Sequence, residues 1–177
     1  MEIRKSQSAD EEGIWEIFRK VVATGDTYVF PPDSSREIFR NHWMKYSPIV
    51  AVEGETIVGT YIIKENQIGL GSHVANGFYV IHPDHHGRGI GKMLGLHSLE
   101  YARSSGFKAM QFNIVVATNS PAVALWKKLG FRIVGTIPRA FRHSTLGFVD
   151  AHIMYQNLEQ MDGEAPSHRA QVSSAHF

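Results

Sequence analysis

Residues 79–94 of the chain read YVIHPDHHGRGIGKML, and this stretch decides the fold. An apolar strand ends at Ile81, glycines follow at every second position from 87 to 91, and a helix begins at about Ile90. Glycines let the backbone approach a ligand closely and adopt conformations that other residues avoid. The unpaired N–H groups and the positive dipole end of a helix N-terminus attract anions. The stretch therefore predicts a loop that binds phosphate at the start of a helix.

The spacing of this loop excludes two common nucleotide sites. A P-loop ends in Gly-Lys-Ser or Gly-Lys-Thr, whereas this loop continues Gly91-Lys92-Met93. A dinucleotide-binding loop is accompanied by an acidic residue at the end of the next strand, and the next predicted strand, Ala109–Val116, ends without one. The predicted phosphate therefore belongs neither to ATP nor to NAD.

Hydrophobic periodicity on either side of the loop predicts an α/β protein. Helices are expected after Asp10, after Ser35, from about Ile90 to Ser105, and between Asn119 and Gly130. Strands are expected over Ile3–Gln7, Ile49–Val52, Thr56–Ile63, His73–Ile81, Ala109–Val116, Phe131–Ile137 and Phe148–Tyr155. A basic loop, Arg139–Gly147, should separate the last two strands. This order predicts one domain with a mixed sheet and helices on its faces.

The composition limits the function classes. Eighteen Lys and Arg residues against seventeen Asp and Glu give a net charge of +1, which offers no bulk attraction for nucleic acid. No apolar run approaches the roughly 20 residues that span a bilayer, and the polar N-terminus does not resemble a signal peptide. The absence of cysteine excludes disulfides, thiolate metal sites and a cysteine nucleophile. We therefore expect a cytoplasmic protein with a domain over residues 1–158 and a disordered or loosely packed polar tail, 159–177.

Two motifs together resemble those of the GCN5-related N-acetyltransferase (GNAT) superfamily. The first, His86-Gly87-Arg88-Gly89-Ile90-Gly91, is similar to the family's acetyl-CoA-binding motif Arg/Gln-x-x-Gly-x-Gly/Ala. The second runs from Asn119 to Trp126, is followed by Gly130-Phe131, and resembles the family's Asn-x-x-Ala/Ser-x-x-Leu-Tyr…Gly-Phe. The resemblance extends over the element order from Ile3 to about Leu158. It implies a mixed, mostly antiparallel sheet of about seven strands with helices on both faces, and acetyl-CoA as co-substrate.

The resemblance also implies which residues contact acetyl-CoA. They lie on the strand before the loop, in the loop and on the fourth helix: Phe78, Val80, His86, Gly87, Arg88, Gly89, Ile90, Gly91, Lys92, Asn119 and Trp126. Two of these depart from the family pattern. His86 replaces the usual Arg or Gln at a position that acts mainly through its backbone. Trp126 replaces the tyrosine proposed to protonate the departing CoA thiolate, and an indole N–H has no acid chemistry near neutral pH.

The family fold implies that the strands His73–Ile81 and Ala109–Val116 separate, and that the pantetheine arm of the coenzyme lies between them. A backbone N–H near Tyr79 or Val80 would then stabilise the oxyanion that forms when an amine attacks the thioester. Tyr79 is therefore the predicted catalytic backbone position, and a covalent acyl-enzyme is not expected without cysteine.

Two asparagines interrupt these apolar strands. Asn76 and Asn113 either satisfy buried backbone groups or face the acceptor, where two amides would bind a carboxylate or orient an amine as catalytic and substrate-binding groups. Tyr28 and Phe30 belong to the loop Thr24–Asp33 and either wall the acceptor site or anchor the loop to the core.

A narrower likeness concerns the acceptor. Asn76-Gly77-Phe78, Phe112-Asn113 and Thr118-Asn119 together with Trp126 are similar to fungal acetyltransferases that act on azetidine-2-carboxylate, a proline analogue. This likeness implies a small amino or imino acid as the amine substrate.

Other ionisable residues are weaker candidates for a general base or a metal site. Asp26, Glu37 and Asp150 are candidates for the general base because their loops should border the acceptor side, although exposed carboxylates are usually only solvated. His82, His85 and His86 suggest a metal site, but the HxxHH spacing lacks the helical frame of HExxH, and we predict no metal.

The sequence therefore predicts an acetyl-CoA-dependent N-acetyltransferase that transfers its acetyl group directly to a small-molecule amine in a ternary complex. A CoA-binding module without catalysis, suggested by Trp126, is the main alternative, and a peptide or protein N-acetyltransferase is the second. By analogy with the family, a homodimer through the late strands is compatible with the sequence.

Overall fold

The computed structural model describes residues 1–159, so apart from Glu159 the predicted tail, 159–177, lies outside the described residues. The helices and strands follow one another in the predicted order. They are β1 (Glu2–Lys5), α1 (Glu11–Val22), α2 (Arg36–His42), β2 (Ile49–Glu53), β3 (Thr56–Glu65), β4 (Val74–Ile81), α3 (Ile90–Ser104), β5 (Ala109–Val116), α4 (Ser120–Lys128), β6 (Arg132–His143) and β7 (Gly147–Asn157). Within this range no helix is long and apolar enough to cross a membrane.

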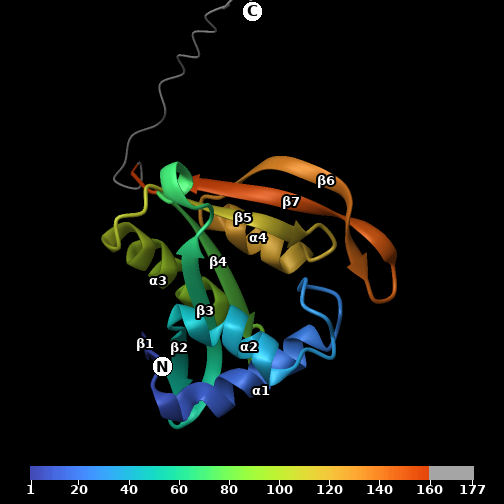
Figure 1. Cartoon of the computed structure of the whole chain (residues 1–177). Coiled ribbons are helices and arrows are strands. Elements are labelled where there is room, and N and C mark those ends of the chain that lie inside the picture. The colour runs from blue at the N-terminus through green and yellow to red at the C-terminus, as the bar shows by residue number, and fades with distance from the viewer. Residues whose placement is uncertain (160–177) are drawn as a thin grey trace, which may run out of the picture.

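The strands form one seven-stranded sheet in the order β1-β2-β3-β4-β5-β7-β6 (Figure 1). Every neighbouring pair is antiparallel except β4 and β5, which are parallel. The crossover between these two strands contains α3, as a parallel pair requires. The expected mixed, mostly antiparallel sheet is therefore confirmed.

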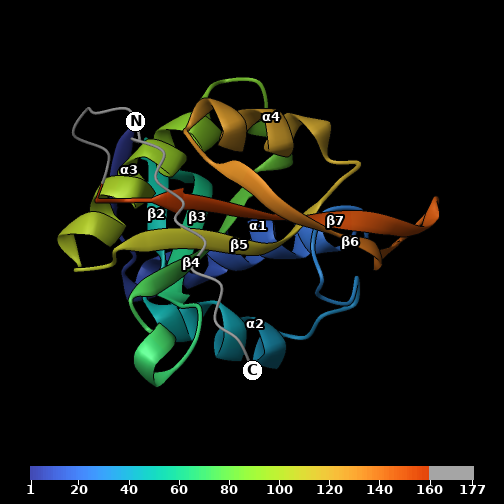
Figure 2. The same ribbon diagram turned by 90° about the horizontal axis from the view of Figure 1, so that it is seen from above.

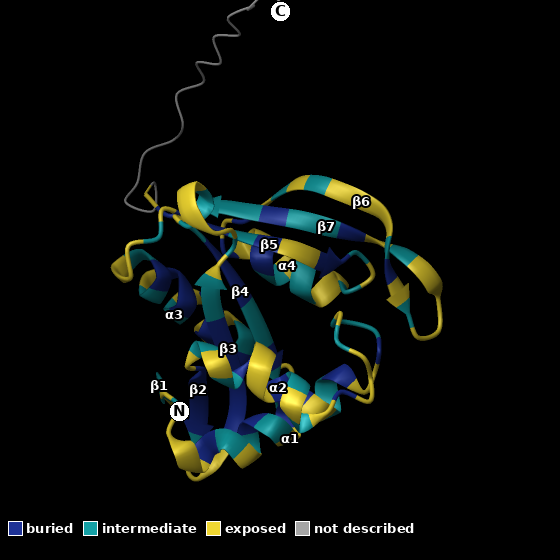
Figure 3. Cartoon of the chain, in the orientation of Figure 1, coloured by how far each residue is buried: buried dark blue, intermediate teal, exposed yellow. Residues whose placement is uncertain are grey.

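Helices cover both faces of the sheet, and the alternation of β2 shows why (Figure 2). Val50 and Val52 pack in a core with α1 and α2, while Ile49 and Ala51 pack on the opposite face in a core with α3. Successive side chains of a strand point to opposite faces, so a strand that is apolar throughout must be covered on both sides. Figure 3 shows the central strands buried and the outer helix faces exposed.

The last two strands are longer than predicted. The segment expected as a basic loop, Arg139–Gly147, continues β6 to His143 and leaves only a short turn before β7. Phe141 pairs with Val149, and Arg142 pairs with Phe148. The prediction of a loop was wrong because β6 is an edge strand, where charged side chains can face solvent without interrupting the ladder.

The feature that creates the site is the separation of β4 from β5. The two strands pair only at Val74–Ala109 and Ala75–Met110 and then diverge, as the resemblance implied. Farther along β5, its register with β7 shifts between Phe112 and Val115. The residues beyond Ala75 on β4 and the shifted part of β5 therefore border an opening in the middle of the sheet.

A glycine lets α3 and α4 pack closely beside this opening. A Cβ atom at Gly95 of α3 would lie 2.4 Å from Cδ1 of Leu129 and 3.2 Å from the ring of Trp126. No real Cβ tolerates the first distance, so the buried Leu129 side chain would have to move to admit any side chain at position 95.

We therefore expect Gly95→Ala to lower the free energy of unfolding by about 1–3 kcal/mol, as overpacking of a core does. Denaturant unfolding of the two proteins measures this difference. A glycine replaced inside an unobstructed helix gains stability instead, by roughly 0.4–1 kcal/mol. A stability equal to or above that of the original protein would therefore contradict the close packing.

Candidate active site

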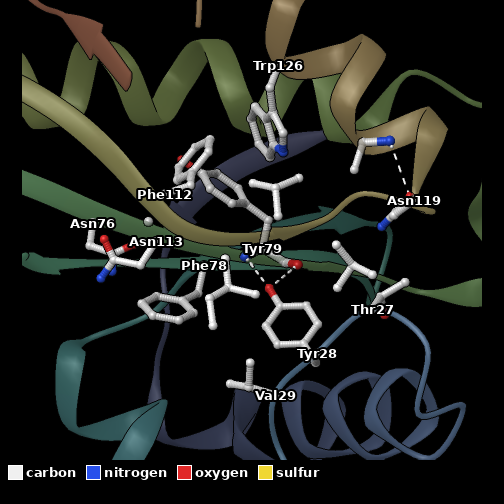
Figure 4. Close-up of a pocket in the computed structure, with 15 residues that line it drawn as sticks. Thr27, Tyr28, Val29, Asn76, Phe78, Tyr79, Phe112, Asn113, Asn119 and Trp126 are labelled. Atoms are coloured by element: carbon white, nitrogen blue, oxygen red, sulfur yellow. Dashed lines mark hydrogen bonds between the residues drawn. The ribbon is translucent and has the colours of Figure 1, made fainter. Parts of the chain in front are cut away.

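A cavity of about 310 Å³ occupies the opening between β4 and β5 (Figure 4). Seven of the predicted site residues line it: Tyr28, Asn76, Phe78, Tyr79, Asn113, Asn119 and Trp126. The other lining residues are Thr27, Val29, Gly77, Phe112, Ile114, Val115, Val116 and Ala122, which the sequence analysis did not single out as site residues. The cavity thus brings the loop after α1, both diverging strands and α4 together.

Trp126 forms an apolar wall of the cavity. Its ring centroid lies 4.7 Å from those of Tyr79 and Phe112, and the side chain is only 8% exposed. Asn119 sets the start of the supporting helix, because its Oδ1 accepts a hydrogen bond from the Ala122 N–H at 3.3 Å. The position where the family has a tyrosine therefore presents an aromatic surface.

Tyr79 lines the cavity, but its hydroxyl bonds to a residue outside the lining. Its hydroxyl lies 2.7 Å from Oγ of Ser98, a buried residue of α3. Burial raises the pKa of the Tyr79 hydroxyl far above its usual value, so it stays protonated. A contribution of Tyr79 to catalysis would therefore come from its backbone, as predicted from the resemblance.

The backbone N–H of Tyr79 faces the opening but already has a partner. It donates to the hydroxyl oxygen of Tyr28 at 2.7 Å, and that hydroxyl donates in turn to the Tyr79 carbonyl at 2.5 Å. Backbone groups alternate between the two edges of a strand, so the N–H of Val80 points toward its partner Thr60 on β3. This corrects the expectation that Val80 could serve equally as oxyanion donor; its side chain is buried in the core.

Asn76 and Asn113 both line the cavity and are labelled in Figure 4. Asn76 is 4% exposed and follows Ala75, the last residue of β4 that pairs with β5. Among the described residues its side-chain amide has no protein hydrogen-bond partner. Gln111 donates to Oδ1 of Asn113 at 2.9 Å, which leaves the Asn113 NH₂ group to donate elsewhere. The pair therefore offers both a hydrogen-bond acceptor and donors to a ligand.

The loop after α1 closes one side of the cavity. Ser144, in the turn between β6 and β7, donates its N–H to the Gly25 carbonyl and its hydroxyl to the Thr24 carbonyl, each at 2.9 Å. Tyr28 reaches the cavity from this loop, whereas Phe30 is not among the lining residues and packs on Phe18 with ring centroids 5.2 Å apart. For Phe30 the structure thus favours anchoring of the loop over contact with a ligand.

The glycine loop before α3 has the geometry of an anion site. Gly87 and Gly89 have φ values of 76° and 78°, and a Cβ atom at either would meet no atom within 4 Å. No side chain caps α3, and the Met93 N–H is the first to bond back, to the Gly89 carbonyl at 3.1 Å. The preceding N–H groups of this turn, which include those of Ile90, Gly91 and Lys92, are thus available to a ligand.

Two charged side chains of the loop have different surroundings. Arg88 lies 2.9 Å from Oε2 of Glu53 and 2.7 Å from Nδ1 of His85, so it is tied to the edge of the loop. Lys92 and His86 are exposed at the surface. The positive charge at the rim thus lies beside the unpaired N–H groups.

His82, one of the histidines of this loop, has hydrogen-bond partners at both ring nitrogens. The Nε2 atom of His82 lies 3.2 Å from Nζ of Lys20, and its Nδ1 accepts the Asp84 N–H at 3.2 Å. Within residues 1–159 no three histidine or carboxylate side chains are placed to hold a metal ion.

The candidate bases do not line the cavity either. Asp26 bonds to Thr24 of its own loop, Asp150 accepts the Arg139 N–H at 2.9 Å, and Glu37 is exposed on α2. The polar side chains that line the cavity are therefore three amides, two phenols, the Thr27 hydroxyl and the Trp126 indole, and no carboxylate is among them.

Comparisons with known proteins agree with this geometry. The model of the acetyltransferase (GNAT) family matches residues 13–131. The N-acetyltransferase aca1 of Schizosaccharomyces pombe is 30% identical, with 80% of this chain and 77% of the relative covered. A GCN5-related N-acetyltransferase from Kribbella flavida is 38% identical and superimposes with a TM-score of 0.84 over 88% of this chain and 96% of the other.

A second solved structure shares the fold at lower identity. It is yncA, a putative acetyltransferase from Salmonella typhimurium with its cofactor acetyl-CoA, which is 22% identical with a TM-score of 0.79 over 96% of this chain and 99% of that chain. The family match and the two closer relatives lead to one conclusion. The chain belongs to the acetyltransferase (GNAT) family, as its two motifs predicted, and is an acetyl-CoA-dependent N-acetyltransferase of that family.

Proposed function

We propose that this enzyme transfers the acetyl group of acetyl-CoA to the amine of a small amino or imino acid. The observation that carries the proposal is the Asn76 amide, which has no hydrogen-bond partner among the described residues and lines the same cavity as Asn113, at the point where β4 and β5 separate. An amide that makes no hydrogen bond within the protein and lines a cavity keeps its donors and its acceptor available, which supports a role in binding a polar ligand.

The donor would occupy two connected regions. Its diphosphate would accept hydrogen bonds from the N–H groups of the turn that begins α3, with the open space at Gly87 and Gly89 allowing close approach. Its pantetheine arm would lie along the unpaired edge of β4, with the acetyl group near Tyr79. Coenzyme A supplies the activated thioester, and the protein supplies orientation and hydrogen bonds.

The acceptor would bind on the other side of the cavity, against the two asparagines. Asn76 can accept a hydrogen bond from the amine, and the Asn113 NH₂ group can donate to a carboxylate. The likeness to azetidine-2-carboxylate acetyltransferases supports an acceptor that carries both groups. The bonds from Ser144 to residues 24 and 25 hold the loop after α1 against the β6–β7 turn, and residues 27–29 of this loop line the cavity, which supports a small molecule over a peptide.

The chemistry requires the amine and the thioester to be held in attacking geometry. The lone pair of the amine attacks the thioester carbonyl carbon, the tetrahedral intermediate expels CoA thiolate, and the amine loses a proton. With no cysteine in the chain, direct transfer in a ternary complex is favoured over an acyl-enzyme.

Release of free thiol from acetyl-CoA, measured against amino acids, imino acids, polyamines and short peptides, tests the proposal. We expect the highest kcat/KM for a small amino or imino acid. Tight CoA binding with no thiol release on the whole panel would contradict catalysis and favour a binding module. A preference for peptides would contradict the assigned acceptor class.

A further inference from the structure

The hydroxyl of Tyr28 is hydrogen-bonded to the two backbone groups of Tyr79 that face the opening. It lies 2.7 Å from the Tyr79 nitrogen and 2.5 Å from the Tyr79 carbonyl oxygen, and Figure 4 shows it reaching the strand from the opposite side of the cavity. It accepts from the N–H and donates to the carbonyl. Tyr79 lies in the part of β4 that no longer pairs with β5. The Tyr28 side chain, 51 residues away in sequence, thus provides the hydrogen bonds that a neighbouring strand would otherwise make.

This position coincides with the one that a thioester oxygen would take. An oxygen that accepts from the Tyr79 N–H must lie at about 2.9 Å from the nitrogen, where the phenolic oxygen now lies. The phenol must therefore move aside when the donor binds. A shift by one O–H···O distance, about 2.7 Å, leaves the hydroxyl in contact with the incoming oxygen and able to donate to it.

We propose that Tyr28 is a catalytic residue whose hydroxyl yields the Tyr79 N–H to the thioester oxygen and then donates a second hydrogen bond to that oxygen. The proposal rests on the proposed binding of acetyl-CoA along β4. Tyr28 and Tyr79 together would then form the oxyanion hole, one through its side chain and the other through its backbone.

The reaction balances without a change in the protonation of Tyr28. The amine lone pair forms the new C–N bond as the C=O π electrons move to the oxygen, which both donors stabilise. The C–S bond breaks when this electron pair returns, CoA leaves as thiolate, and the ammonium proton leaves to the thiolate or to water. Burial raises the pKa of the Tyr28 hydroxyl far above its ordinary value, which suits a group that donates a hydrogen bond but keeps its proton.

No other hydroxyl of the surrounding tyrosines is placed for this role. The Tyr79 hydroxyl lies against Ser98, and the hydroxyl of Tyr61 lies 2.7 Å from Nδ1 of His97 on the α3 face of the sheet. The indole of Trp126 provides no O–H group. Among the tyrosines that line the cavity, Tyr28 is the one whose hydroxyl faces the reacting groups.

Tyr28→Phe tests the proposal through the carbonyl stretch of bound acetyl-CoA, assigned by ¹³C labelling of the acetyl group. Each hydrogen bond to the carbonyl weakens it, so we expect a lower stretching frequency in the original enzyme than in Tyr28→Phe. With the accepted amine, kcat should fall about 100-fold on loss of one of two oxyanion donors. The Kd for acetyl-CoA should not weaken, because phenylalanine no longer competes for the Tyr79 N–H.

Tyr61→Phe is the matched control, since it removes another buried phenol that bonds one partner outside the cavity. It should leave both the stretching frequency and kcat unchanged, and its unfolding midpoint shows what loss of such a bond costs. Equal frequencies in Tyr28→Phe and the original enzyme, both loaded with acetyl-CoA, would overturn the role of Tyr28. Failure of the original enzyme to bind acetyl-CoA at all would instead overturn the proposed function.

Discussion

Asn76→Ala is expected to lower kcat/KM for the accepted amine by about 100-fold without destabilising the protein. The activity falls because the amide would orient the amine against the thioester, and a methyl group cannot. Stability should be unchanged or slightly raised, because Asn76 has no protein hydrogen-bond partner among the described residues and is 4% exposed. Steady-state kinetics and thermal unfolding of the same preparations measure the two effects.

This combination separates binding from packing. If Asn76 instead satisfied a buried backbone group, its truncation would destabilise the protein, since that backbone group would be left unpaired. Asn66 provides a control, because its Oδ1 likewise has no hydrogen-bond partner but lies outside the cavity. Asn66→Ala should retain the original kcat/KM. An Asn76→Ala enzyme with unchanged kinetics for every accepted amine would remove Asn76 from the site.

The sequence predicted the elements that local pattern and motif control. The glycine loop, the cap at Asn119 and the order of strands and helices depend on short-range spacing, and each has its predicted place. The divergence of β4 and β5 followed from the family resemblance. Cavity residues Asn76 and Asn113 were recognised because polar side chains interrupt apolar strands.

Contacts between distant segments could not be predicted in this way. The bond from Tyr79 to Tyr28 depends on how the loop after α1 folds over the sheet, and no spacing in either segment encodes that approach. The sequence also could not predict that Phe30 packs on Phe18 whereas Tyr28, from the same loop, lines the cavity. Because backbone N–H groups alternate between the two edges of a strand, only one of the Tyr79 and Val80 N–H groups can face the cavity. The pairing of Val80 with Thr60 on β3 is needed to decide which one does.

The anion site at the start of α3 leads to the other large expected effect. Gly89→Val should weaken acetyl-CoA binding by about 100-fold, as measured by calorimetry, because it removes close access to several unpaired N–H groups at once. Gly89 has a φ of 78°, which β-branched residues avoid, and its missing Cβ faces open space that the diphosphate would fill.

The substitution also strains the backbone, which by itself could alter binding. A second glycine with a positive φ, away from the loop, is therefore needed for comparison. Gly106 follows the other end of α3, has a φ of 91°, and likewise has no atom within 4 Å of an added Cβ. Gly106→Val should lose a similar amount of stability, of order 1–3 kcal/mol, yet bind acetyl-CoA as the original enzyme does. If the two variants bound the coenzyme equally well, the diphosphate would have to lie elsewhere, and the glycines of the loop would serve only the turn from β4 into α3.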